Sequence, residues 1–227
     1  MPITKIDIAA VEPFADGSEF GAAGPYVRIH GVAKGELDPA AAQNAVIVDL
    51  DKAQRNARGM VEYEVDLFIL RPADPRRGSG TLVYDVTNRG RKVILGRLDE
   101  APGDANTNDP RTVRDAGLGF TLGRGYTLVW SGWDSSAPRA NNGMTARLPM
   151  ALEGGALENG KPMVRRIRHE FHIGTRTPGK GDAVTLSYPS VSTDNRRARL
   201  TVRDRESDAH SEIPPDAWEF VEARTIR

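Results

Sequence analysis

The chain contains no cysteine, and this absence excludes disulfide bonds, thiolate nucleophiles and cysteine-based zinc or iron–sulfur sites. The chain also has no excess of positive or negative charge. Lys plus Arg and Asp plus Glu both number 31, so the formal net charge at pH 7 is zero. A neutral chain has no global field to gather nucleic acid or anionic lipid, and we expect neither nucleic acid nor membrane as a partner.

Long apolar runs are also absent. No stretch of consecutive apolar residues is long enough to cross a bilayer, and residues 1–8 lack the basic and apolar segments of a secretory signal. We therefore expect a cytoplasmic location, unless a leader was removed. The 227 residues, 39% of them hydrophobic, suffice for one large domain or two small ones.

Few aromatic residues and few histidines are available for binding. Aromatic residues make up 6% of the chain, which is little for stacking on RNA, and the Arg-rich stretches 165–168 and 196–199 alternate with apolar residues like solvated strand faces. His169 and His172 would point to opposite faces of a strand, so one metal ion would be hard to reach from both. We expect no metal and no cofactor.

Two apolar runs in the middle of the chain, Thr81–Thr87 and Tyr126–Trp130, are apolar at nearly every position. This pattern is typical of a parallel pair of strands buried on both faces, joined by a helix in a βαβ unit. For that helix the sequence predicts Asp109 as N-cap, Pro110 in the first turn and an end at Gly123 or Gly125.

Polar residues follow each of these two strands. Ligands of open α/β sheets gather where parallel strands end at their carboxyl side. A glycine directly after a buried strand lets backbone N–H groups approach a ligand, as in an oxyanion hole, although a plain turn between strand and helix explains the same residues equally well. The candidate residues are Asn88, Arg89 and Gly90 at the oxyanion-side turn and Ser131, Trp133 and Asp134 along a possible cleft.

The rest of the chain is predicted to be rich in strands. Residues 3–11, 26–37, 44–50 and 60–70 read as strands, and the last alternates Val61 to Ile69 against Glu62 to Asp66, as in a half-buried antiparallel strand. From residue 161 onward, four short strand patterns (163–173, 183–188, 197–203 and 218–221) form a small antiparallel unit. We therefore expect an α/β fold with high β content, a first domain of residues 1–134 and a β-rich second region of residues 135–227.

Two motifs suggest phosphate binding or a serine nucleophile, but neither has the neighbouring residues and elements that such a site needs. Gly174–Gly181 nearly spells a P-loop, yet Gly181 stands where magnesium needs a hydroxyl, and a strand pattern follows where a helix must begin, so a hairpin turn is the better interpretation. No Gly-x-Ser-x-Gly nucleophile elbow is present. Ser131 comes closest, but no helical pattern follows it, and we interpret it as structural.

Several longer motifs carry a family resemblance. They are Gly24-Pro25-Tyr26, residues 44–53, 55–59, 61–63, 70–72 and 82–86, then Asn88-Arg89-Gly90, residues 125–133, 198–204 and 215–218. In this order they resemble the amino-terminal part of a bacterial family described as α/β-hydrolase domain-containing proteins. The resemblance implies the early strands of a hydrolase sheet with Asn88-Arg89-Gly90 at its oxyanion-side turn, followed by a β-rich insertion from about residue 135.

Members of that family are longer than this chain, so their nucleophile, acid and base histidine would lie beyond Arg227, and the resemblance assigns no catalytic residue here. Our first hypothesis is a fragment of a hydrolase of carboxylic esters or related acyl bonds. Alone it would be inactive and would self-associate through an uncovered sheet edge. The alternative is a non-catalytic β-rich binding or assembly module that engages carbohydrate or a protein through Trp130, Trp133 and Trp218.

Overall fold

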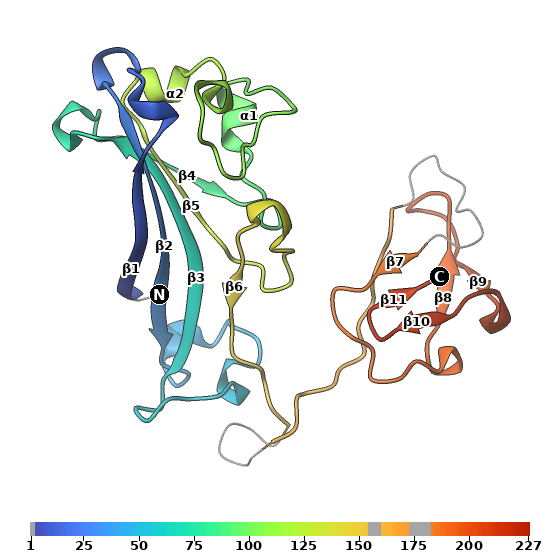
Figure 1. The fold of residues 1–227 in the computed structure, drawn as a ribbon. Helices are drawn as coiled ribbons and strands as arrows, with labels where there is room; N and C mark the ends of the chain where they lie inside the picture. The colour runs from blue at the N-terminus through green and yellow to red at the C-terminus, as the bar shows by residue number, and fades with distance from the viewer. Residues whose placement is uncertain (1–2, 154–159, 173–182) are drawn as a thin grey trace. The chain divides into compact units, whose positions relative to one another are not determined.

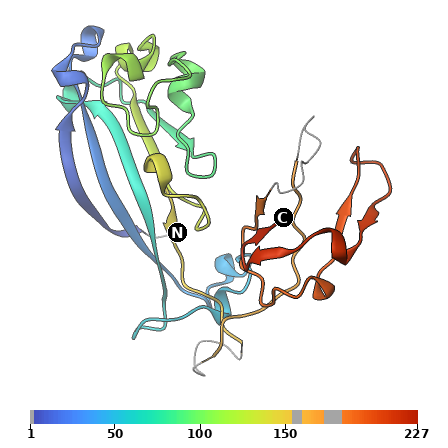
Figure 2. The same ribbon diagram turned by 45° about the vertical axis from the view of Figure 1, so that its right-hand side comes forward.

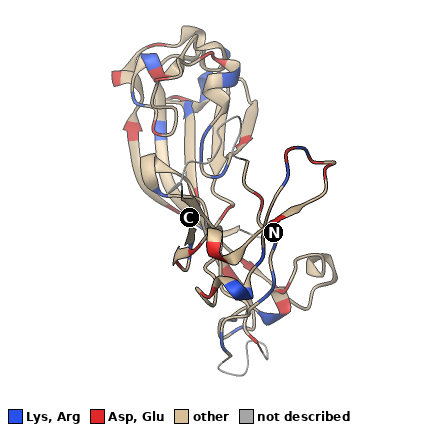
Figure 3. Cartoon of the chain, turned by 90° about the vertical axis from the view of Figure 1, so that its right-hand side faces the viewer, with Lys and Arg blue, Asp and Glu red and all other residues tan. Residues whose placement is uncertain are grey.

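A computed structural model describes residues 3–153, 160–172 and 183–227. The chain forms two compact units, Met1–Met163 and Val164–Arg227 (Figure 1). Strands predominate over helices in both units. Basic and acidic residues are interspersed along the chain (Figure 3).

The first unit is built on one mixed sheet. Its strands run in the order β1-β2-β3-β5-β4, and β6 pairs with β3. Strands β4 and β5 are parallel, which confirms the pairing predicted from the two apolar runs, and all other pairs are antiparallel. The strands are β1 Ile3–Pro13, β2 Tyr26–Leu37, β3 Val61–Pro72, β4 Leu82–Val86, β5 Thr127–Ser131 and β6 Ala146–Arg147.

Strands β2 and β3 form an unbroken ladder from Tyr26 opposite Pro72 to Leu37 opposite Val61. Within it, the ring of Tyr63 lies over Gly35, its cross-strand partner. A Cβ atom at Gly35 would fall 2.2 Å from the Tyr63 ring, so only glycine leaves room for this packing. The buried Tyr63 ring joins a small core with Leu37 and Leu50.

The connection between β4 and β5, residues 87–126, is mostly irregular, and the single helix predicted there is wrong. A short 3-10 helix begins after Thr112, whose side chain forms a capping box with Asp115, and it ends at Gly117. Gly117 and Gly119 have φ angles of +60° and +64°, which a helix does not admit. The predicted N-cap, Asp109, bonds to arginine side chains instead.

The helices of the chain are correspondingly short. The α-helices are α1 Ile94–Leu98 and α2 Phe120–Gly123. The 3-10 helices are Ala15–Gly17, Gly21–Ala23, Ala42–Asn44, Leu50–Lys52, Pro75–Arg77, Val113–Ala116, Ala140–Asn142, Asn195–Arg197 and Pro215–Ala217.

The strand predicted over residues 44–50 is also wrong. The segment holds turns and the ends of two 3-10 helices, and Val46 and Val48 are 84% and 86% exposed. Both edges of β2 are already occupied by β1 and β3, so the short apolar run has no free partner beside it.

One face of the sheet carries the main core. Phe68, Leu70, Leu128 and Trp130 are buried on this face, together with residues of the β4–β5 connection such as Leu95. Figure 2 shows the ribbon of this connection, in green, against the upper part of the sheet. In β3 the buried side therefore changes along the strand. Val61 and Tyr63 are buried at its start and Phe68 and Leu70 at its end, whereas the sequence predicted one buried face, Val61 to Ile69, throughout.

The other face is uncovered at β4. Leu82, Tyr84 and Val86 share this face and are 60%, 51% and 60% exposed, and β4 is the outer strand of the sheet. The opposite edge, β1, is interrupted by two register shifts and carries Lys5 and Asp7. Such devices protect an edge strand from pairing with another chain, and β4 has none of them on its exposed side.

The second unit is small and antiparallel, as predicted. Its strands are β7 Val184–Thr185, β8 Leu200–Val202, β9 Ser211–Ile213, β10 Phe220–Glu222 and β11 Thr225–Ile226, in sheets ordered β10-β11-β7 and β8-β9. The strand predicted over residues 163–173 is not present in the described part, 163–172.

The second unit is also shorter than the region 135–227 expected from the sequence. Residues 135–153 belong to the first unit because their backbone bonds to its sheet. The amide of Met144 donates to the Gly90 carbonyl at 2.9 Å, and the amide of Thr145 donates to Asp66 at 2.9 Å.

A buried carboxylate holds the sheet and the β4–β5 connection together. Asp85 Oδ2 accepts hydrogen bonds from the Trp130 indole at 2.7 Å and from the amides of Val93 and Ile94 at 2.9 and 3.0 Å. Asp85→Ala leaves three buried donors unpaired, and we expect a loss of about 3 kcal/mol in the free energy of unfolding, measured by denaturant titration. Asp85→Asn keeps one acceptor oxygen for all three donors and should cost much less; an equal loss in both variants would contradict this account.

Candidate functional site

The turn that follows β4 has a special backbone. Asn88 and Arg91 face each other across it, with amide-to-carbonyl distances of 2.8 and 3.1 Å. The two residues between them, Arg89 and Gly90, have φ angles of +49° and +87°, as in a type I′ turn. A Cβ atom at Gly90 would lie 2.8 Å from the Met144 carbonyl oxygen, so this position requires glycine.

The turn keeps two adjacent amides free of internal partners. Within residues 3–153, the backbone N–H groups of Arg89 and Gly90 donate to no other group, while the Gly90 carbonyl accepts from Met144. Two neighbouring amides without a protein acceptor are what an oxyanion site requires.

The end of β5 lies beside this turn, as the sequence predicted. The Arg89 guanidinium is 3.3 Å from the Asp134 carboxylate, and the Trp133 indole donates to the Thr87 carbonyl at 2.7 Å. Partial burial opposes ionisation of Asp134, but hydrogen bonds from Ser136 and the nearby Arg89 hold its pKa below the usual value. Arg89, Trp133 and Asp134 are thus brought together at the turn, whereas their chemical role stays a prediction.

Ser131 is directed elsewhere. Its hydroxyl bonds to the Tyr84 hydroxyl at 2.5 Å on the uncovered face of the sheet, and its carbonyl accepts from Thr87. Among the described residues, no histidine or carboxylate bonds to this hydroxyl. The geometry agrees with Ser131 as a structural residue, because a serine nucleophile needs an adjacent base.

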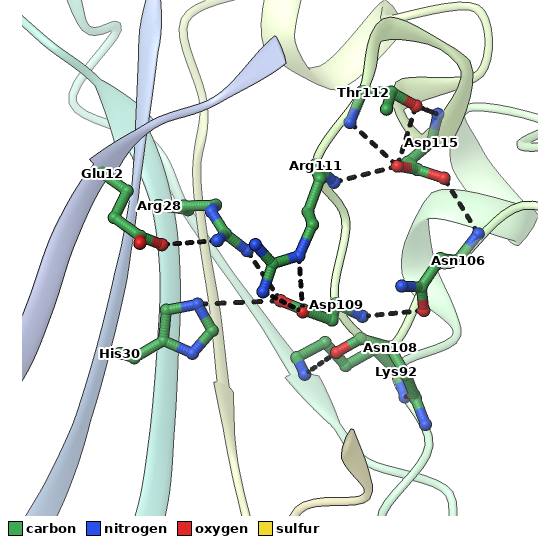
Figure 4. Close-up of polar contacts among 10 residues, drawn as sticks. All are labelled: Glu12, Arg28, His30, Lys92, Asn106, Asn108, Asp109, Arg111, Thr112 and Asp115. Atoms are coloured by element: carbon green, nitrogen blue, oxygen red, sulfur yellow. Dashed lines mark hydrogen bonds and ion pairs between the residues drawn. The ribbon is translucent and has the colours of Figure 1, made fainter. Parts of the chain in front are cut away.

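Figure 4 shows a polar cluster, partly buried, between β2 and the β4–β5 connection. The patterns in the sequence did not indicate this cluster. Arg28 is 3% exposed, and its guanidinium donates to Asp109, itself 5% exposed, at 2.7 Å and also bonds to Glu12. Arg111 binds the second oxygen of Asp109 at 2.7 Å. The sequence carried only a weak signal for this cluster: Arg28 shares one face of β2 with Tyr26, which is fully buried.

Lys92 is the most unusual member of this cluster. It is 5% exposed, its ammonium bonds to the Asn108 carbonyl, and it lies 4.5 Å from the centre of the Phe68 ring. Among the described residues, no carboxylate lies within ion-pair distance of it. Burial therefore lowers the pKa of Lys92 to about 8.

His30 lies next to the Arg28–Asp109 ion pair and would join it only as the charged imidazolium. Its Nε2 atom is buried without a hydrogen-bond partner, 3.7 Å from Asp109 Oδ1, and its ring packs edge-on against Phe68 at 4.6 Å. Burial and the neighbouring Arg28 charge lower the pKa of His30.

The other motifs give little support for a site. The P-loop-like residues 174–181 lie outside the described part of the chain. His169 stacks on Phe171 with ring centres 4.5 Å apart, and no cluster of three potential metal ligands occurs among the described residues. Within the same residues, no helix is both long and apolar enough to span a membrane.

Comparisons with protein-family models, curated proteins and solved structures found no match to this chain.

The lowered pKa of Lys92 predicts a pH dependence of stability. Because the unfolded lysine titrates near pH 10.4 and the folded one near 8, the unfolded state binds more protons between these values. The free energy of unfolding should therefore rise by up to about 3 kcal/mol from pH 8 to 10.4 through this residue. Lys92→Met should remove that contribution, measured by urea titration at several pH values, while Lys52→Met, which breaks a partly exposed ion pair with Asp49, should retain it. Identical pH profiles for wild type and Lys92→Met would contradict the assignment.

Proposed function

We propose that this chain supplies the oxyanion-side half of an α/β-hydrolase-like enzyme that cleaves carboxylic esters or related acyl bonds. In such a reaction, a nucleophile attacks the acyl carbon and negative charge develops on the carbonyl oxygen. Backbone N–H groups held rigidly beside that oxygen stabilise the charge.

The turn at residues 88–91 is the observation that carries the proposal. It follows the carboxyl end of a parallel strand, its two central amides have no internal acceptor, and it is braced by Met144 and by the Arg89–Asp134 pair. Rigid bracing matters because an oxyanion site acts through donors that need no reorganisation during the reaction.

The proposed enzyme needs further elements for its nucleophile, acid and base. The described residues offer no bonded serine–histidine pair, whereas the sheet has room for additions at the outer edge of β4 and on the face of Leu82, Tyr84 and Val86. An added strand and covering helices would bury these side chains, and they would also deliver catalytic groups to the same edge as the turn.

The alternative, a binding module that uses tryptophan, has less support. Trp130 is fully buried and Trp218 is 8% exposed, so neither ring offers a surface to a carbohydrate. Trp133 is 52% exposed and alone remains available among the three. If the chain is instead an assembly module, the open edge of β4 is the feature that supports this function.

The hydrolase proposal predicts no esterase activity for the chain alone. Purified 1–227 should hydrolyse p-nitrophenyl acetate no faster than buffer, because nucleophile and base are not assembled. Turnover that disappears in Ser131→Ala would instead make Ser131 the nucleophile.

In a protein encoded by a reading frame that continues past the Arg227 codon and contains Gly-x-Ser-x-Gly, Gly90→Ala should lower kcat by about 10²–10³-fold with little change in KM, because the displaced amides no longer meet the oxyanion. Gly80→Ala is a matched control. Gly80 has a φ angle of +76°, and a Cβ atom there meets nothing within 4 Å. Equal effects of the two substitutions, or a stop codon directly after Arg227, would overturn the hydrolase proposal.

The open edge predicts self-association of the isolated chain. Sedimentation velocity should show oligomers that increase with concentration, because β4 offers unpaired backbone groups beside exposed apolar side chains. The double variant Leu82→Lys/Val86→Lys should shift the population toward monomer. The control Val46→Lys/Val48→Lys changes two valines outside the sheet that are even more exposed, and it should leave the population unchanged. A monodisperse wild-type monomer would count against the missing-neighbour interpretation.

A further inference from the structure

Besides Asp85, a second buried carboxylate fastens the β4–β5 connection to the sheet. Asp109, in the connection, binds Arg28 of β2 at 2.7 Å, and the two side chains are 7% and 4% exposed. The same stretch is held from outside the cluster by the amide of Ala15, which donates to the Arg111 carbonyl at 3.0 Å. The contact between β2 and residues 106–112 thus depends strongly on one ion pair (Figure 4).

His30 holds a nitrogen in position to disturb this pair. It lies two residues after Arg28 on the same face of β2, and its buried Nε2 atom has no partner. The nearest carboxylate oxygen, Asp109 Oδ1 at 3.7 Å, is the one that Arg28 already occupies. An N–H donor at Nε2 would therefore have to share Asp109 Oδ1 with Arg28.

Burial, and after it the Arg28 charge, makes a positive charge on His30 unfavourable. Arg28 lies on its own strand and Lys92 approaches from the connection, while Glu12 on β1 and Asp109 are the neighbouring carboxylates. Glu12 is 47% exposed and Asp109 is shared with Arg111, so their charges are partly screened or already used. Protonation would place a third cation beside Arg28 and Lys92.

We propose that protonation of His30 releases residues 106–112 from the sheet, so that the cluster acts as an acid-sensitive latch. The proton comes from solvent, and because both ring nitrogens of an imidazolium carry hydrogen, Nε2 then presents a donor to Asp109. The imidazolium then competes with Arg28 for Asp109 Oδ1, and the cost of three neighbouring cations is relieved when the connection moves away into water.

Release of residues 106–112 would also disturb the turn at residues 88–91. The side chain of Asn108 accepts from the Lys92 amide at 2.8 Å, and its amide group donates to the Asn141 carbonyl at 3.0 Å. Lys92 directly follows the turn, and Met144 braces Gly90 three residues after Asn141. The latch would therefore couple proton concentration to the order of the candidate site, whatever reaction that site serves.

The direction of the pH effect follows from linkage. The closed state lowers the pKa of His30 through burial and then through Arg28, whereas an open, solvated histidine titrates near 6.5. The open state therefore binds more protons, and opening becomes easier as the pH falls below about 6.5. If only the open state binds this proton, the population of open molecules increases about ten-fold between pH 7.5 and 5.5, and this is the largest effect expected.

Hydrogen exchange followed by mass spectrometry tests the latch. Peptides from residues 88–116 are compared at pH 7.5, 6.5 and 5.5, with exchange times scaled to the intrinsic rate at each pH. The expected result is a several-fold loss of protection by pH 5.5, and no such loss in His30→Gln. The control His210→Gln removes a histidine of the second unit, which bonds to Thr201, and should behave as wild type.

Protection that does not change with pH in the wild type would overturn the proposal, as would an equal loss in His30→Gln. A measurement on the unmodified protein covers the case in which that variant does not fold. The ring protons of His30 are then followed by NMR, and their titration must coincide with the loss of protection; a ring that titrates while residues 106–112 stay protected would also exclude the latch.

Discussion

The parallel pairing of β4 and β5 is the constraint on which the first unit depends. Two parallel neighbours cannot be joined by a tight turn, so the chain must leave the carboxyl end of β4, cross the sheet and return to the start of β5. The same pairing brings the carboxyl ends of both strands together, and the turn at residues 88–91 therefore lies beside Trp133 and Asp134. The covered face, the candidate site and the open edge all follow from this one arrangement.

The crossing connection is stabilised by buried carboxylates rather than by helix. Because most of it is irregular, its backbone amides need acceptors from outside a helical ladder. Asp85 accepts from the amides of residues 93 and 94, Asp99 from Thr121, and Asp115 from the amides of residues 106, 111 and 112. These aspartates replace the internal hydrogen bonds that a long crossover helix would have supplied.

Within this connection, the pKa values of two buried aspartates are shifted in opposite directions. Asp99 is fully buried, and burial raises its pKa although Thr121 donates to it. Asp115 is also buried, but the several backbone amides that it accepts outweigh burial and lower its pKa. The number of donors, as well as depth, therefore decides whether the pKa of a buried aspartate in this connection rises or falls. For Lys92 and His30, burial is the largest influence and lowers the pKa of both.

The sequence by itself determined the strands that β-periodicity marks clearly and the pairing of the two apolar runs. Strand β2 begins and ends where its pattern does, and the glycine after β4 marked a turn that the structure shows to need positive φ. These features are local, because alternation, turn residues and apolar runs record the preferences of neighbouring residues.

Tertiary structure alone decided which residues cover each face of the sheet. Residues 44–50 are apolar but follow a strand, β2, whose two edges are already paired, and two glycines interrupted the predicted crossover helix. Arg28 and Asp109 meet across 81 positions in the chain, a contact that no local pattern encodes because it exists only once the connection folds back over β2.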